Sequence, residues 1–152
     1  MSETKKDFPS YYAKLELDDA QKKKTGDHIR FVEKNINEIE DVFISEQLDA
    51  SGKRKRYNDL LLFTSEEVFI VKDFLKTDEY ISTHLKKEIN LWKLRPVNYE
   101  VGNSTQDSWL VLEIETIHGF KLELKASGKN CDTLWGIFKS YVLKQKSSVR
   151  AW

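Results

Sequence analysis

The side chains best suited to metal binding are scattered along this chain. His28, His84 and His118 are predicted to lie in a helix, at a strand end and in a turn, and none has a second histidine four residues away, as a helical metal site requires. Cys131 is expected in the first turn of a helix, where the helix dipole can lower a thiol pKa, although a small buried thiol is the preferred interpretation. The sequence therefore predicts no metal site.

The carboxylates show no catalytic arrangement either. Adjacent acids such as Asp18 and Asp19, or Glu66 and Glu67, fall in polar segments with nothing to desolvate them and tune their pKa values. The Gly128 and Lys129 pair lacks the upstream glycine and the following Ser or Thr of a phosphate-binding loop. We expect a protein that is not an enzyme, with no catalytic residues and no cofactor.

One concentrated basic feature stands out, the run Lys53, Arg54, Lys55 and Arg56. It is expected in the loop after the first strand, where adjacent cations can meet anionic head groups at about 1 kcal/mol each. The other interpretation, which we prefer, is a solvated loop balanced by Asp49 and Asp59. The run is thus a candidate site for an anionic ligand or lipid.

Aromatic residues form a second feature, with four Trp and six Tyr in a small chain. Trp and Tyr favour interfaces as well as cores. The segment from Phe8 to Leu17 is too apolar for a free tail and too short to fold alone, so we expect it to pack on the domain or on a partner. The possible partner contacts are Tyr11, Tyr12, Trp135 and Trp152.

Composition narrows the class of protein. The 152 residues carry 25 Lys plus Arg against 25 Asp plus Glu, which disfavours a nucleic-acid binder because such proteins normally show a basic excess. A single cysteine excludes an internal disulfide and a cysteine-ligated zinc site. No window approaches the roughly 18 apolar residues of a membrane span, and no signal peptide is evident. We expect one soluble, cytoplasmic domain.

Apolar spacing predicts a helix at each end of the chain. Between Asp18 and Glu40 the apolar residues fall on one helical face, and Asp18 or Asp27 can cap it. Gly26 suggests two helices, the better one beginning at Asp27. The last helix is expected after a cap at Asn130, with this stripe: Leu134, Ile137, Phe138, Tyr141 and Val142.

The middle of the chain predicts short antiparallel strands. One hairpin is expected between residues 60 and 71, and the clearest one joins residues 109–116 to residues 120–126. Glu113 and Glu115 are expected to face lysines of the neighbouring strand. Pro96 should end a strand or place it at a sheet edge. This order indicates an antiparallel sheet or partial barrel closed by a terminal helix.

At this point the stretch 41–146 resembles pleckstrin-homology-like domains of the short bacterial type. The resemblance rests on the hairpin 60–71, Tyr80–Thr83 leading to Lys87–Leu91, Leu112–Thr116 followed by His118-Gly119 and Phe120–Leu124, and a closing helix containing Trp135. It implies an α+β fold: a pleckstrin-homology-like antiparallel partial barrel of six to seven strands, closed by a C-terminal amphipathic helix, with an extra N-terminal helix. The chain then divides into an arm and helix (1–40), the domain (41–146) and a tail (147–152).

The resemblance leaves two functions open, since this fold serves lipid and peptide binding alike. We expect a non-enzymatic binding module that makes protein contacts through an open strand edge, the N-terminal arm or the leading helix. The alternative is peripheral binding to anionic lipid through residues 53–56, because lipid-binding members of the family carry basic residues in the loop joining their first two strands. The partner and the oligomeric state stay open.

Overall fold

A computed structural model describes residues 8–143 of the chain. The fold is α+β, with helices and strands in this order: α1 (Phe8–Ala13), α2 (Asp19–Asn35), β1 (Asp41–Leu48), β2 (Arg54–Phe63), β3 (Val68–Val71), β4 (Ile81–Thr83), α3 (Leu85–Glu88), β5 (Ile89–Val97), β6 (Trp109–Thr116), β7 (Lys121–Ser127) and α4 (Asn130–Ile137), which continues as a π-helical turn, η1 (Phe138–Leu143).

The leading helix is continuous, so the prediction of two helices is wrong. Asp18 caps it: its carboxylate accepts a hydrogen bond from the Gln21 N–H at 2.8 Å, and the Gln21 side chain accepts one from the Asp18 N–H at 3.1 Å. Gly26 lies buried inside α2, where a Cβ atom would come 3.5 Å from the Tyr12 hydroxyl oxygen. The glycine therefore lies beside α1 at an ordinary contact distance and does not break the helix.

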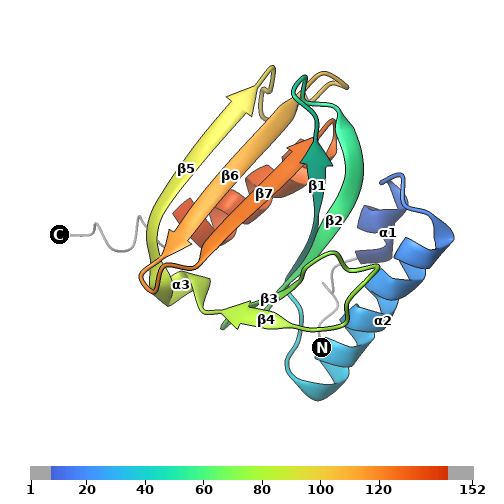
Figure 1. The fold of residues 1–152 in the computed structure, drawn as a ribbon, viewed down its shortest axis with the longest axis vertical. Helices are drawn as coiled ribbons and strands as arrows, with labels where there is room; N and C mark the ends of the chain where they lie inside the picture. The colour runs from blue at the N-terminus through green and yellow to red at the C-terminus, as the bar shows by residue number, and fades with distance from the viewer. Residues whose placement is uncertain (1–7, 144–152) are drawn as a thin grey trace.

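The strands form two antiparallel sheets, with the orders β1-β2-β3-β4 and β5-β6-β7 (Figure 1). Among the described residues they do not close into a barrel. Both predicted hairpins are confirmed, with Leu60 opposite Val71 in the first and Leu110 opposite Ala126 in the second. Glu115 faces Lys121 as expected, but Glu113 faces Glu123, so that part of the charge prediction is wrong.

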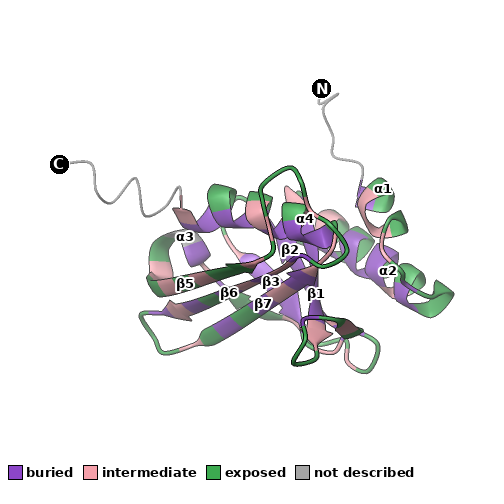
Figure 2. Ribbon diagram, turned by 90° about the horizontal axis from the view of Figure 1, so that it is seen from above, coloured by how far each residue is buried: buried purple, intermediate pink, exposed green. Residues whose placement is uncertain are grey.

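Much of the four-stranded sheet is buried on both faces, although Ile81 and Ser82 of β4 are exposed. Leu61 and Phe63 of β2 enter a core with α4, whereas Leu60 and Leu62 enter a second core with Ile29 of α2. Figure 2 shows α4 over one face of β5–β7 and α1 with α2 beside the other sheet. The arm that contains Phe8 thus packs on the domain, which is one of its two expected positions.

The final helix differs from expectation at its start. Asn130 is the first helical residue and not the cap, and the capping position, Lys129, makes no side-chain capping hydrogen bond. The Asn130 side chain is buried and donates to the Ile44 carbonyl at 3.0 Å. Asn130 therefore connects the helix to β1.

Candidate functional site

Among residues 8–143, β5 is an edge of the three-stranded sheet and pairs with β6 alone. The Ser108 carbonyl accepts from the Gly128 N–H, and the Thr116 N–H donates to the Phe120 carbonyl, both at 2.9 Å. Even-numbered residues of β6 therefore bond toward β7, and odd-numbered ones bond toward β5. It follows that Lys93, opposite Glu113, directs its backbone groups to β6.

The next residues of β5 direct their backbone groups the other way. Trp92 and Leu94 alternate with Lys93, so their N–H and C=O groups point away from the sheet. Pro96 alternates in step with Trp92 and Leu94, so its nitrogen, which carries no hydrogen, also points away from the sheet. This is the side of an edge strand on which a proline is tolerated. The prediction from Pro96 of a sheet edge is confirmed. Two residues thus offer both a donor and an acceptor to a further strand.

Side chains divide β5 into two faces. Trp92 packs edge-on against Phe138 of η1, with ring centroids 4.9 Å apart, so the even-numbered side chains lie on the helix side. Leu91, Lys93 and Arg95 lie on the opposite face and are exposed. The Arg95 guanidinium carbon lies 5.0 Å from the Trp109 ring centroid.

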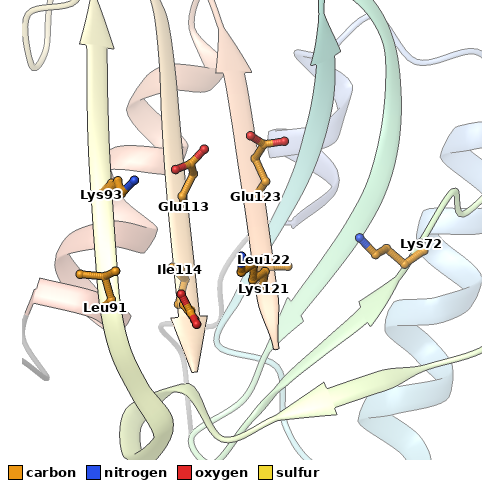
Figure 3. A pocket seen from close by; sticks show the side chains of 9 residues that line it. Lys72, Leu91, Lys93, Glu113, Ile114, Lys121, Leu122 and Glu123 are labelled. Carbon is orange, nitrogen blue, oxygen red and sulfur yellow. The ribbon is translucent and has the colours of Figure 1, made fainter. Parts of the chain in front are cut away.

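A groove of about 400 Å³ crosses the same face of the sheet, from Leu91 on β5 to Lys72 beyond β3 (Figure 3). Glu113 lies between Lys93 and Glu123 in the strand register. Glu123 is paired with Lys125 at 3.6 Å, but Lys93 and Glu113 form no ion pair with any residue that the structure describes. The groove therefore keeps charges of both signs available beside the β5 edge.

The basic run does not form the expected loop. Only Lys53 lies in the turn, and the other three residues begin β2. Arg54 is ion-paired with Glu16 and lies 4.6 Å from the Tyr57 ring centroid. The sequence does not predict a strand at Arg54–Arg56, because the apolar pattern of β2 begins only after these three charged residues.

The second arginine of this run is also engaged within the chain. The Arg56 Nε atom donates to the Gln47 side chain at 2.8 Å, and its Nη1 atom lies 3.5 Å from Asp73. The expected partners act elsewhere: Asp49 accepts from the Lys53 backbone N–H, and Asp59 pairs with Lys72. The two arginines therefore have partners within the chain, but these are not Asp49 and Asp59.

The aromatic candidates lie in different environments. The Tyr11 hydroxyl donates to Asn130 Oδ1 at 2.7 Å and accepts from the Ile44 N–H at 3.0 Å, and burial raises its pKa. Tyr12 is half-buried, and Trp135 is half-buried against Phe138. Trp152 lies outside the described residues. The Tyr11 hydroxyl is therefore occupied by internal bonds.

No family model, curated protein or solved structure matches this chain. Within residues 8–143, none of the helices is long and apolar enough to cross a membrane.

The histidines do not gather into a metal site. His28 is buried, with Nδ1 2.6 Å from the Tyr80 hydroxyl oxygen and Nε2 3.6 Å from Asp78, and burial lowers its pKa. His84 and His118 each lie 3.7 Å from a single glutamate. In the described part of the chain, no three histidine, cysteine or acidic side chains are placed to share a metal ion.

The single thiol is inaccessible. Cys131 is 0% exposed, its Sγ atom donates to the Ala126 carbonyl at 3.5 Å, and burial raises the thiol pKa to about 12. The preferred interpretation of a buried thiol is confirmed, whereas a pKa lowered by the helix dipole is not found.

Proposed function

We propose that this protein is a non-enzymatic binding module that takes up an extended segment of a partner protein along β5. The observation that carries the proposal is the nine-residue strand Ile89–Val97, which has a hydrogen-bonded neighbour on one side only within the part of the chain that the structure describes. Backbone pairing at such an edge supplies affinity, and alternate side chains supply specificity.

The wider fold supports this assignment. Four antiparallel strands, three further strands and a terminal helix follow one another in the order that we expected for a pleckstrin-homology-like domain, and we extend the proposal to that fold. The inert, buried Cys131 thiol is compatible with a binding role in a reducing cytoplasm.

Hydrogen exchange on the full-length protein tests strand addition. We would titrate it with blocked peptides in which valine alternates with Glu, Gln or Lys. Any peptide that adds to β5 should slow exchange of the Trp92 and Leu94 amides, which point outward. If no peptide protects these two amides, the proposal fails.

A proline substitution provides the matched control. L94P removes an outward N–H without removing a bond to β6, so it should abolish peptide binding. L94A trims the same side chain but keeps that N–H and should bind. Circular dichroism would establish that both variants are folded. Equal binding by the two folded variants would contradict pairing at this edge.

Attachment to anionic lipid is the second candidate. Lys53 and Lys55 are exposed and can meet a charged surface. Arg54 and Arg56 already interact with Glu16 and Asp73, respectively, so the run offers fewer free cations than its sequence suggests. Protein binding therefore has the stronger support.

A further inference from the structure

We infer that β5 selects an extended partner segment whose one face is acidic and whose other face is apolar. This inference rests on the proposed strand addition and adds the chemistry of the segment: carboxylates at positions i and i+2 beside Lys93 and Arg95, with apolar residues between them.

The cationic face of β5 carries the first step. Lys93 and Arg95 are two residues apart on the same face and both are exposed. Toward the sheet their neighbours are Glu113 and Val111, respectively, whereas none of the described strands lies on their other side. Residues opposite one another in neighbouring strands interact directly, and opposite charges stabilise the pair. An added strand therefore gains most from acids at these two positions.

The remaining β5 side chains define the apolar positions. Leu91 is 48% exposed on the same face as Lys93, so it favours an apolar residue two positions from the first acid. On the opposite face, Trp92 and Leu94 are half-buried against the core that includes Phe138. Their added neighbours would extend this apolar surface. The complementary segment thus alternates acidic and apolar residues beside Arg95 to Trp92 and has one further apolar residue beside Leu91.

The same charges disfavour a second copy of this chain as the occupant. An antiparallel pair of β5 strands centred on Leu94 would set Lys93 of each copy beside Arg95 of the other. Like charges directly opposite each other destabilise pairing, and cations on an edge strand are a common defence against self-association. In this register the charges favour a different, acidic chain over a second copy.

Comparison of the Glu, Gln and Lys peptides by NMR titration tests the inference. With the wild-type protein we expect the Glu peptide to bind about tenfold more tightly than the Gln peptide, and the Lys peptide to bind most weakly. This preference should shrink as salt is raised, because the paired charges are exposed.

Charge reversal on β5 should invert the order. K93E/R95E is expected to bind the Lys peptide best, and K121E/K125E, which makes the same charge change on β7, should keep the wild-type order. If the K93E/R95E protein fails to fold, K93Q/R95Q should bring the three affinities together.

The outcomes separate the two proposals. If the three peptides bind equally and protect the Leu94 amide, strand addition stands and the acidic preference is wrong. A preference for the Lys peptide, or inversion by K121E/K125E, would also overturn the preference. If none binds, the proposed function itself fails.

Discussion

The Asn130 Nδ2 atom of α4 donates to Glu46 Oε2 of β1 at 2.8 Å. The same carboxylate accepts from the Ser127 N–H at 3.0 Å, and the neighbouring Ser45 Oγ accepts from the Lys125 N–H at 3.0 Å. These contacts join β1 to β7 through side chains, and no backbone ladder links the two sheets among residues 8–143. The corner between the sheets thus depends on a carboxylate that is only 2% exposed.

Glu46 should make the free energy of unfolding fall as pH rises. Burial raises the pKa of this carboxyl in the folded protein, so its contribution is fully present below its unfolded pKa of about 4.3 and is lost as pH rises through the folded pKa. Urea unfolding from pH 4 to 8 would measure the free energy of unfolding. E46Q should lack this decline, and a constant difference between wild type and E46Q would contradict the assignment.

The Tyr11 hydroxyl should stabilise the fold. Y11F leaves the Ile44 N–H and the Asn130 side-chain oxygen without this partner, at a cost of about 1–3 kcal/mol in the free energy of unfolding. Y12F removes a hydroxyl from the adjacent tyrosine of α1 and should cost less than 1 kcal/mol. Equal losses in chemical denaturation would show that the buried bonds do not explain the role of Tyr11.

Gly52 should resist substitution. Its φ is +87°, and a Cβ atom would lie 2.5 Å from Nε1 of the Trp109 indole. We expect G52A to lower the melting temperature and to cost about 2 kcal/mol or more. G136A is the control: Gly136 lies inside α4 with no atom near its added Cβ, so this variant should gain about 0.4–1 kcal/mol. A neutral G52A would argue against the close approach.

Vesicle cosedimentation should separate the two functions. The protein-binding proposal predicts no salt-sensitive retention on anionic vesicles, relative to neutral ones. Retention that K53A/K55A abolishes would instead favour the lipid alternative, because those two lysines are exposed. R54A/R56A is the comparison variant, since its arginines have partners within the chain.

Periodicity explains why some of the fold was predictable. Leu110, Leu112 and Ile114 alternate strictly with less buried residues, which specifies one strand face, and Pro96 restricts β5 to an edge. Gly26 misled the helix prediction because the capping box and the tertiary packing of α2 offset the cost of one glycine inside the helix. The role of Asn130 was equally hidden, since its partner Ile44 is 86 residues away.

The candidate site was only partly visible in the sequence. An open strand edge was expected, but local patterns do not show which strand lacks a partner. The sequence indicated the basic run instead, although the partner of Arg54, Glu16, lies 38 residues away in the chain. The sequence does not predict the groove, because Lys72 follows β3 of one sheet whereas Glu123 lies in β7 of the other.

The two-sided burial of the four-stranded sheet also bears on synthesis at the ribosome. The helix α2 emerges before the strands that it covers, and most of the stability of a protein helix comes from tertiary packing of its apolar face. Its contacts are complete only after Phe74 and Tyr80, which follow β3, have been made. Residues 8–35 should therefore wait, largely unfolded, until about half the chain is available, and then shield the outer face of the β2-β3 hairpin.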